Sequence, residues 1–412
     1  MSRERPSTRA AGDGVRVGTQ EGLRRHNLGT LLGHLHLHGA LSRADLTHRM
    51  GLNRSTIAAL VAELATLGAV QEETPAGSRT GAGRPSLLVR PRPDRVQVVA
   101  VEIGVDHLDV ALVGLGGQVM ARRHDRLGTA SPTPQVLVEQ LCAAVHAVLA
   151  DGGLDRHVVG LGVALPGVVR QGDGCVRFAP NLRWTDVPLG SLLSAAMPGT
   201  AVRIGNDGDL GALAEHRRGA ARGVDDVVFV AGETGIGGGF IVGGRPLTGA
   251  GGYAGEVGHM TVRAGGRLCH CGSYGCWETE IGAGAIAAAL GAPSPRSDEL
   301  VPLLRSAGAR GDGALDEVAR YVGIGLGNLV NLLNPALVIL GGLLREVYPL
   351  ADSCVRAGLR STALRAPAAE VRISLPALGG DAVLIGAAEM VWDGLLDDPA
   401  TMLRPPTPLP SP

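Results

Sequence analysis

The sequence places four potential metal ligands and two carboxylates within one short stretch. This stretch runs from Glu256 to Glu278. Its potential ligands are His259, Cys269, Cys271 and Cys276. Imidazole nitrogen and thiolate sulfur are the ligands that zinc prefers, and four of them close a tetrahedral shell without an open position. We therefore predict a structural zinc site whose loop turns both flanking carboxylates towards one pocket, with free thiols as the alternative.

The other cysteines do not suggest a disulfide framework. Cys142, Cys175 and Cys354 are scattered along the chain, whereas disulfide frameworks are typical of small secreted domains. The N-terminus is rich in Arg and lacks an apolar signal core, and no apolar run is long enough to span a bilayer. We therefore expect a cytoplasmic protein that is not inserted into a membrane.

The charge is distributed unevenly along the chain. The apolar fraction of 45% and the length of 412 residues are typical of a globular protein with two or three domains. Residues 1–95 contain 14 Arg and 8 acidic residues, whereas the remaining residues contain 24 Arg and 31 acidic residues. A basic N-terminal part on an acidic body favours an anionic partner for the N-terminal part, such as nucleic acid.

The basic part contains three predicted helices. Leucines at helical spacing predict the first over 27–38. Ser42 and Asp45 form a capping-box pattern for the second, and Asn53 caps the third. Three short helices with a tight turn at Gly51 are typical of a helix-turn-helix, although a packing module without DNA is the alternative. The candidate DNA contacts around the second and third helices are Arg43, Arg54, Ser55 and Thr56.

A hairpin pattern follows the third helix. Residues 70–90 start and end with strand-like residues and have a basic, Gly-rich centre. Such a hairpin after a helix-turn-helix is typical of a wing, in which Arg79 and Arg84 reach phosphates or a minor groove. A flexible linker is the alternative. We place the winged helix-turn-helix in residues 21–90 and predict disorder for residues 1–20.

Beyond residue 95, strands and helices alternate, which predicts an α/β domain. Two strands joined by a glycine turn are predicted over 98–114 and again over 227–243. We interpret this recurrence as a weak internal duplication, with two similar halves facing each other across a cleft. We place this domain in residues 96–395 and predict that the Pro-rich residues 396–412 form an unstructured tail.

Three further features suit a ligand site. Asn206 and Asp207 follow a strand, where a carboxylate can bind a hydroxyl or act as a general base, and a helix N-cap is an equally good interpretation. Asn181 lies in a Pro-flanked loop and offers a donor and an acceptor to a sugar hydroxyl, although a simple turn is the commoner role. A Gly-rich turn can line an anion-binding concavity. Its residues include Thr234, Gly235, Gly237 and Gly238.

The order of these motifs resembles the ROK family of repressors, open reading frames and sugar kinases, over about residues 22–395. The most specific part is the pattern from Glu256 to Glu278, and the N-terminal extension is similar to the xylose-type and glucose-type repressors. The resemblance implies a two-lobed actin-like, ribonuclease-H-like sugar-kinase fold and structural zinc on the four ligands named above. It also implies sugar contacts from Asn181, Asn206, Asp207, Glu256, His259 and Glu278.

One departure separates this chain from the kinases that it resembles. Their first hairpin carries an Asp-x-Gly-Gly-Thr turn for phosphate and magnesium, whereas this chain reads Glu102-Ile-Gly-Val-Asp106. A β-branched Val105 suits a tight phosphate turn poorly, and Asp106 adds negative charge where the phosphates would lie. The turn at Gly235, which faces ATP in the kinases, would then be vestigial. These changes predict a sugar sensor rather than a kinase.

We therefore expect a sugar-responsive transcriptional regulator, most simply a repressor of carbohydrate-metabolism genes. It would act as a homodimer or a dimer of dimers on operator DNA, with a monosaccharide as effector. The alternative is an ATP-dependent, glucokinase-like sugar kinase with an added DNA-binding domain, in which Asp207 is the catalytic base. A third interpretation keeps the DNA binding and replaces the sugar with a protein partner.

Overall fold

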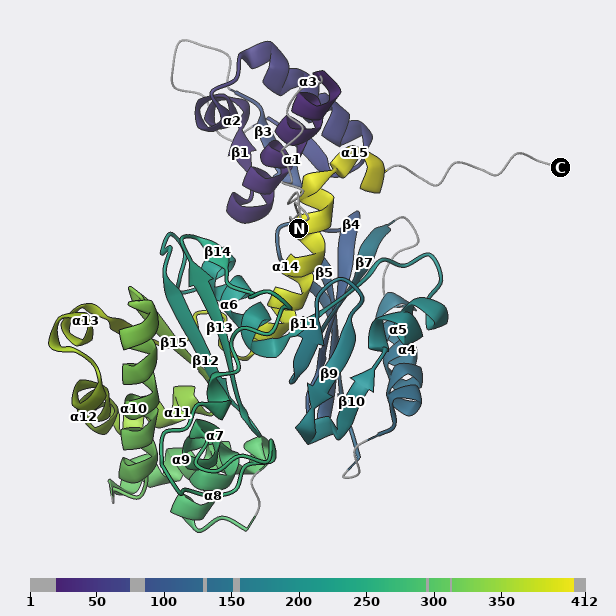
Figure 1. Cartoon of the computed structure of the whole chain (residues 1–412). Helices are drawn as coiled ribbons and strands as arrows, with labels where there is room; N and C mark the ends of the chain where they lie inside the picture. The colour runs from purple at the N-terminus through teal and green to yellow at the C-terminus, as the bar shows by residue number, and fades with distance from the viewer. Residues whose placement is uncertain are drawn as a thin grey trace, which may run out of the picture.

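The protein consists of a head above a body with two lobes (Figure 1). The computed structural model describes residues 20–74, 86–128, 132–150, 156–293, 296–311 and 313–403. The segment 1–19, for which disorder is predicted, lies outside the described residues. Gln20 begins the first helix, so the head starts earlier than the leucine pattern from residue 27 predicts.

Three helices and a three-stranded antiparallel sheet form the head. The helices are α1 (Gln20–His38), α2 (Arg43–Met50) and α3 (Arg54–Thr66), and the strands are β1 (Leu41–Ser42), β2 (Val70–Glu73) and β3 (Leu88–Pro91). The predicted capping box of Ser42 and Asp45 is confirmed, and the Asn53 side chain accepts a hydrogen bond from the backbone N–H of Thr56. The strands are ordered β1-β3-β2. The centre of the β2–β3 hairpin lies outside the described residues.

The two lobes are built on two five-stranded sheets with the same strand arrangement. The first contains β4 (Val96–Ile103), β5 (His107–Gly114), β6 (Val119–Arg126), β7 (His157–Leu165) and β11 (Val202–Asn206). The second contains β12 (Val227–Gly232), β13 (Ile236–Val242), β14 (Arg245–Pro246), β15 (Leu337–Gly342) and β16 (Arg372–Ser374). The orders are β11-β7-β4-β5-β6 and, read from its other edge, β16-β15-β12-β13-β14. In each sheet three antiparallel strands are followed by two parallel ones, which confirms the predicted duplication.

Helices cover these sheets and fill the space between them. In the first lobe, α4 (Pro134–Ala150) and α5 (Leu189–Ala196) accompany a small sheet of β8 (Val168–Arg170), β9 (Cys175–Ala179) and β10 (Trp184–Val187). Two helices lie between the lobes, namely α6 (Asp207–Arg218) and α14 (Ala382–Asp397) (Figure 1). The second lobe carries α7 (Trp277–Ile281), α8 (Ala283–Leu290), α9 (Ser297–Arg310), α10 (Asp316–Leu333), α11 (Leu344–Leu350), α12 (Asp352–Thr362) and α13 (Arg365–Glu370). Within the described ranges, no helix combines the length and apolarity that a bilayer crossing requires.

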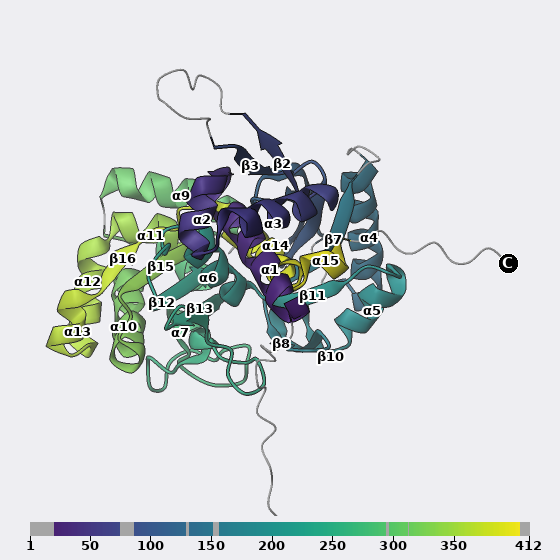
Figure 2. The same cartoon turned by 90° about the horizontal axis from the view of Figure 1, so that it is seen from above.

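The head and the first lobe share one hydrophobic core. Buried Leu28 and Leu60 of the head belong to the same cluster as Val98 of β4 and Trp392 of α14. The second lobe has a separate core around Trp277. Figure 2, the view from above, shows α1 lying over α14. The head is therefore packed as a continuation of the first lobe.

The C-terminal segment completes the head, which corrects the predicted boundary at residue 396. Helix α14 extends to Asp397 and is followed by α15 (Pro399–Met402). Leu403 is buried in the core shared with the head, and Asp398 forms an ion pair with Arg25 of α1 at 3.5 Å. Residues 396–403 are thus ordered, because tertiary contacts with α1 outweigh the Pro-rich composition on which the prediction rested.

Candidate functional site

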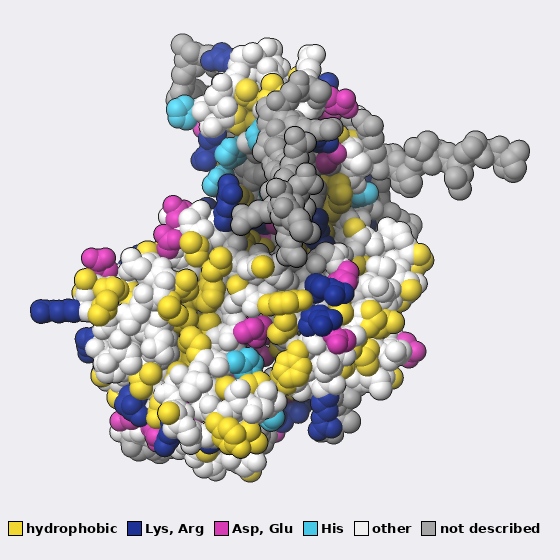
Figure 3. Space-filling view, in the orientation of Figure 1, with side chains coloured by type: hydrophobic (Ala, Val, Ile, Leu, Met, Phe, Trp, Pro, Cys, Tyr) yellow, Lys and Arg dark blue, Asp and Glu magenta, His cyan; other side chains and the backbone are white. Residues whose placement is uncertain are grey.

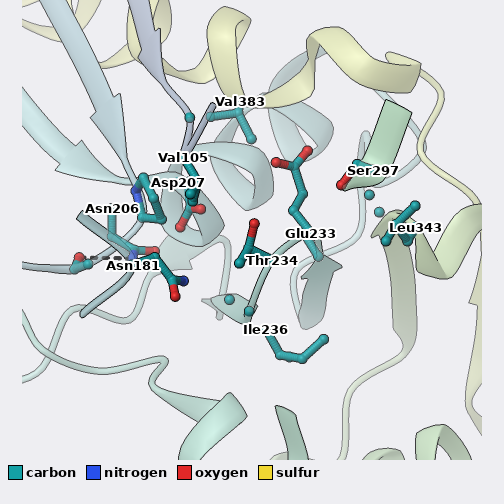
Figure 4. Close-up of a pocket in the computed structure, with 18 of the residues that line it drawn as sticks. Val105, Asn181, Asn206, Asp207, Glu233, Thr234, Ile236, Ser297, Leu343 and Val383 are labelled. Atoms are coloured by element: carbon teal, nitrogen blue, oxygen red, sulfur yellow. Dashed lines mark hydrogen bonds between the residues drawn. The ribbon is translucent and has the colours of Figure 1, made fainter. Parts of the chain in front are cut away.

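A cavity between the lobes brings all six predicted sugar ligands together. The ligands in its lining are Asn181, Asn206, Asp207, Glu256, His259 and Glu278. Figure 4 shows Asn181 and Asp207 on the side of the first lobe, with Glu233 and Thr234 facing them from the hairpin of the second lobe. The space-filling view shows acidic and histidine side chains reaching the surface at the seam between the lobes, below the head (Figure 3).

Asn206 and Asp207 have different roles at the start of α6. The Asn206 Oδ1 atom accepts hydrogen bonds from the backbone N–H groups of Gly208 at 2.8 Å and Asp209 at 3.1 Å. Its Nδ2 atom donates to the Gly167 carbonyl at 3.1 Å. Asn206, and not Asp207, is therefore the N-cap of α6, and Asp207 is left to line the cavity.

Burial in the cavity disfavours the ionised form of its carboxyl groups. Burial raises the pKa of Asp207 to about 7, and the charges of Glu233 and Glu256 act in the same direction. Burial also raises the pKa of Glu256 and holds that of Glu102 well above its ordinary value. A carboxyl group whose pKa lies near neutral pH, as that of Asp207 does, can donate to a hydroxyl group as the acid and accept from it as the carboxylate. This lining suits an uncharged polyol.

Two glycines let the hairpin of the second lobe approach these acidic residues. A Cβ atom on Gly235 would lie 2.7 Å from Glu278 Oε2, and one on Gly237 would lie 3.2 Å from Asp207 Oδ1. Thr234 of the predicted phosphate turn also lines the cavity. Gly238 instead packs against Val257, where an added Cβ would lie 2.6 Å from Cγ2. Assigning Gly238 to the phosphate turn is therefore corrected to a packing role.

The four predicted metal ligands lie in one cluster. The ligand atoms of His259, Cys269, Cys271 and Cys276 all lie within 4.8 Å of one another. The Sγ atoms of Cys271 and Cys276 are 3.7 Å apart, as are Cys269 Sγ and His259 Nδ1. A tetrahedral zinc with Zn–S bonds of about 2.3 Å places sulfur atoms roughly 3.8 Å apart. The residues thus fit zinc, with His259 facing the cluster through Nδ1 while its ring also lines the cavity.

The loop that carries these ligands has a second anchor, which the sequence analysis missed. The buried carboxylate of Glu280 in α7 forms ion pairs with Arg263 at 3.3 Å and Arg267 at 3.4 Å, both in the loop. Glu280 lies two residues beyond Glu278, whose Oε2 atom accepts a hydrogen bond from the Ile236 backbone N–H at 3.4 Å. In the sequence, the only indication of this anchor is that Glu280 follows two arginines, Arg263 and Arg267, in the same part of the chain.

The turn of the first hairpin faces the second lobe across the edge of the cavity. Glu102 and Val105 line the cavity, whereas Asp106 Oδ2 meets Arg296 Nη2 at 3.1 Å. A second ion pair joins Arg126 of β6 to Asp298 of α9 at 3.1 Å. The expectation that Asp106 projects its charge into the phosphate region is thus corrected, because Arg296 draws its carboxylate to the lobe–lobe contact.

The predicted DNA contacts fall into three groups. Arg54 and Ser55 are exposed at the start of α3, where Thr56 is half-buried. Arg43 instead pairs through Nε and Nη2 with the two carboxylate oxygens of Glu72, each at 2.5 Å, which ties α2 to β2. This bidentate pair holds its guanidinium beside β2, and a DNA contact from Arg43 stays a prediction. Arg79 and Arg84 lie outside the described residues.

Comparison with known proteins identifies the class to which this fold and cavity belong. The model of the ROK family matches residues 98–393, and the chain belongs to the ROK family. The xylose repressor of Bacillus subtilis (strain 168) is 29% identical over 385 residues, which cover 92% of this chain and 98% of that repressor. The N-acetylglucosamine repressor of Escherichia coli O157:H7 is 28% identical over 335 residues, which cover 77% and 81% of the two chains.

Solved structures of ROK regulators and ROK kinases both resemble the protein. A ROK family transcriptional regulator, a homologue of the Escherichia coli MLC protein, is 26% identical with a TM-score of 0.74 and covers 93% of this chain and 99% of its own. A ROK glucokinase from Streptomyces griseus, in complex with glucose and AMPPNP, is 28% identical with a TM-score of 0.62 and covers 71% and 98%. The regulator therefore matches the head as well as the body, whereas the kinase match has the extent of the body alone.

Proposed function

We propose that this protein is a sugar-responsive transcriptional repressor of carbohydrate-metabolism genes. The observation that carries the proposal is that one cavity contains all six predicted sugar ligands, directly below a head that shares its core with the first lobe. The names of the xylose and N-acetylglucosamine repressors, which match most of the chain, support it. A sugar bound between the lobes would change their relative angle and so alter the affinity of the head for DNA.

The charges in the cavity favour an uncharged monosaccharide as effector. The acidic residues of the lining are Glu102, Asp207, Glu233, Glu256 and Glu278. The basic side chains in the same lining are those of His259 and Arg345. A phosphorylated sugar or a nucleotide is disfavoured, because its phosphate would repel every carboxylate that is ionised and would find few basic side chains to pair with. Neutral hydroxyl groups, in contrast, find both donors and acceptors.

We further propose that the head is a winged helix-turn-helix that binds operator DNA. Its three helices and β2–β3 hairpin have the order that this motif requires, and Arg54 and Ser55 at the start of α3 are exposed for contact with base edges. Arg79 and Arg84, at the centre of the hairpin, would supply phosphate contacts. A homodimer or a dimer of dimers would place two copies of α3 in successive major grooves.

Structural zinc would hold the loop of the second lobe that carries three of the predicted sugar ligands, Glu256, His259 and Glu278. His259, Cys269, Cys271 and Cys276 would bind the ion. Bound zinc would cross-link the loop and leave no open position for catalysis. His259 would then be held with one ring nitrogen on the metal and its other edge towards the cavity, and Glu278 would be fixed beside it.

A sugar kinase is the second candidate, favoured by Asp207. Its pKa of about 7 suits a general base that deprotonates a sugar hydroxyl. Against it, the ion pair between Asp106 and Arg296 occupies the edge where the kinases' phosphate turn would open, and Glu102 adds a carboxyl group to the lining. We expect no ATP- and Mg²⁺-dependent phosphorylation of hexoses. Phosphorylation that Asp207→Asn abolishes would establish the kinase instead.

The proposed function is tested by DNA binding with and without sugar. DNA selected by the protein from a random pool is titrated in gel-shift assays with D-xylose, D-glucose or N-acetylglucosamine at millimolar concentrations. We expect at least one of these sugars to weaken DNA binding by about tenfold, a coupling of about 1.4 kcal/mol. Asp207→Asn should bind DNA normally but lose the sugar response. DNA binding that none of the sugars changes would count against the proposal.

A further inference from the structure

One helix connects the cavity to the underside of the head. Asp207, the first residue of α6, lines the cavity, and Arg217 and Arg218 form its last turn. A helix of 12 residues spans about 18 Å. At this far end the two arginines meet α14 and, through Arg218, also α1 of the head. The same rigid element thus touches the proposed effector site and the part of the molecule that carries the DNA-binding surface.

A buried ionic cluster lies where α6 meets the head. We call it the hub and define it as His36, Arg217, Arg218 and Glu389. The Glu389 carboxylate of α14 pairs with Arg218 Nε and lies 3.4 Å from Arg217 Nη1 and 3.2 Å from His36 Nε2. Burial alone would raise the pKa of Glu389, but His36 and the two arginines lower it to about 2. The hub therefore contains an ionised carboxylate that is fully enclosed by its partners.

Arg218 joins three elements within the hub. Its Nη1 atom donates to the Gly116 carbonyl of the β5–β6 turn at 2.8 Å and to the His36 carbonyl of α1 at 3.2 Å, while Nε pairs with Glu389. The Gly116 backbone N–H donates to His36 Nδ1 at 3.0 Å, so the neutral ring carries its proton on Nε2 and donates it to Glu389. A displacement of Arg218 therefore breaks bonds that hold the C-terminal end of α1 against the body.

Close backbone packing leaves α6 little freedom to move alone. A Cβ atom on Gly208 would lie 2.6 Å from the Gly238 carbonyl oxygen of β13, in the second lobe. A Cβ atom on Gly386 of α14 would lie 2.0 Å from the Leu210 carbonyl oxygen of α6. Because protein interiors are close-packed, α6 cannot move independently of both neighbours. A movement of the second lobe must either break the contact between Gly208 and β13 or carry α6 with it, in which case α6 slides along α14 in a shear motion.

We infer that α6 transmits the effector signal, by turning with the second lobe on sugar binding and displacing Arg217 and Arg218 from the hub. This inference rests on the proposed function and names the route by which it is regulated. The head, α14 and the first lobe share a core to which Leu210 and Leu213 of α6 also belong, so α6 follows the second lobe by sliding along α14 while the head stays with the first lobe. The hub is the point at which the moving helix meets the stationary head, and the loss of its bonds releases α1 from its fixed orientation.

The route is tested by comparing two identical substitutions. Arg218→Met keeps the apolar stem of the side chain and removes the bonds to His36, Gly116 and Glu389. Arg25→Met is the matched control, because Arg25 also ties α1 to the C-terminal segment, through Asp398, but makes that contact without α6. The DNA dissociation constant is measured with and without whichever of D-xylose, D-glucose and N-acetylglucosamine acts on the wild type. Sugar affinity is measured by calorimetry.

We expect Arg218→Met to bind the sugar within about twofold of the wild type, while the effect of the sugar on DNA affinity falls from about tenfold to below about threefold. Arg25→Met should keep the wild-type effect. A full sugar effect in Arg218→Met would overturn the inferred route and leave the proposed function standing. A wild type whose DNA binding ignores all three sugars would overturn the proposed function, and the route with it.

Amide hydrogen exchange on the wild type gives an independent answer if Arg218→Met does not fold. Addition of the active sugar should change exchange in the last turn of α6, in the 115–117 turn and in the last turn of α1, with little change in α4 of the first lobe. Unchanged exchange at α6 and α1, in a protein whose DNA affinity responds to the same sugar, would overturn the route.

Discussion

At the scale of single residues, the neighbours Asn206 and Asp207 have different roles: Asn206 caps a helix, and Asp207 lines the cavity. The Asn206 side chain holds the start of α6 through two backbone N–H groups and a carbonyl. Asp207 is thereby available to the cavity, at the cost of a carboxyl group that is poorly solvated. In the proposed function this carboxyl group serves sugar binding, and its raised pKa makes its cost to stability depend on pH.

We predict that Asp207→Asn stabilises the ligand-free protein at pH 8 more than at pH 4. Because the pKa of Asp207 is raised to about 7, the folded protein binds this proton more tightly than the unfolded chain does. The destabilisation is absent below the ordinary Asp pKa, grows as the pH rises and is complete above about pH 7. Thermal unfolding at both pH values measures it. Asp94→Asn, at a largely exposed position, is the control, and an equal shift at both pH values would contradict the prediction.

We predict that Cys271→Ser removes the zinc and weakens the sugar response while leaving DNA binding without sugar intact. Loss of one ligand opens the cluster, and His259 and Glu278 are then no longer held beside the cavity. Loss of contacts that hold metal ligands in place changes metal affinity or activity by about 10–100-fold, and we expect a decrease in sugar affinity of the same order. Metal analysis and sugar calorimetry check the outcome, with Cys354→Ser, outside the cluster, as the control. Zinc-free protein with normal sugar affinity would show that the metal does not shape the cavity.

The local motifs of the site were predictable, and its buried ion pairs were not. The spacing between Glu256 and Glu278 indicated both the metal cluster and two cavity carboxylates, because all of these residues lie in one stretch. The pair of His36 and Glu389 joins positions 353 residues apart. No local pattern marks such a contact, since each partner alone reads as an ordinary polar residue in a helix. The pair of Arg43 and Glu72 is a further example, as Glu72 lies on a later strand.

At the scale of elements, the second and third helices of the head place two arginines in different surroundings. Arg54 is exposed at the start of α3, where its charge is available to DNA. Arg43, at the start of α2, is committed to β2 through Glu72. A basic residue near a recognition helix is thus a DNA contact only if the fold leaves its guanidinium accessible.

We predict opposite outcomes for the corresponding alanine variants. Arg54→Ala should weaken DNA binding by about 1–3 kcal/mol with little change in melting temperature, because it removes a contact to DNA. Arg43→Ala should lower the melting temperature of the head, because Glu72 loses its bidentate partner. Gel-shift titrations at two salt concentrations, with thermal unfolding of both variants, distinguish the two roles. The assignment fails if Arg43→Ala weakens DNA binding without any loss of stability.

Long elements with regular patterns are predictable from the sequence, and short ones only where a cap marks them. The run 157–165 predicts a strand, which agrees with β7, and the pattern from about 133 to 150 predicts a helix, which agrees with α4. No helix is predicted over α9, because Pro302 interrupts its pattern, or over α5, whose 8 residues lack the side-chain cap that marks α2, a helix of the same length. The strands of the small sheet have 3 to 5 residues each, too few for a periodicity to show.

At the scale of the whole molecule, the chain forms two packing units that do not follow the order of its sequence. The first contains the head, the first lobe and the C-terminal helices, and the second is the other lobe with its own core. The repeated glycine turns predict the duplicated sheets. No pattern in the sequence predicts that the N-terminal head packs against α14 and α15, because this packing depends on contacts between distant parts of the chain.

We predict that deletion of residues 396–412 destabilises the head and abolishes DNA binding, whereas deletion of residues 404–412 does neither. The longer deletion removes buried Leu403, the Asp398 partner of Arg25 and the Leu396 backbone against which Gly29 of α1 packs. Loss of a buried leucine alone costs about 2–5 kcal/mol. The shorter deletion leaves every described contact in place. Gel shift and calorimetry compare the two, and normal DNA binding by the longer deletion would refute a structural role for this segment.

The position of α14 and α15 also bears on how the protein is made. The head is translated before both lobes, yet its core is completed by Trp392, Leu395 and Leu403, which are translated after them. Nascent chains and prematurely terminated products therefore contain a head with an open apolar surface and no α14 to orient it. We expect such fragments to be substrates for chaperones and proteases, so that only chains that include α14 and α15 compete for DNA.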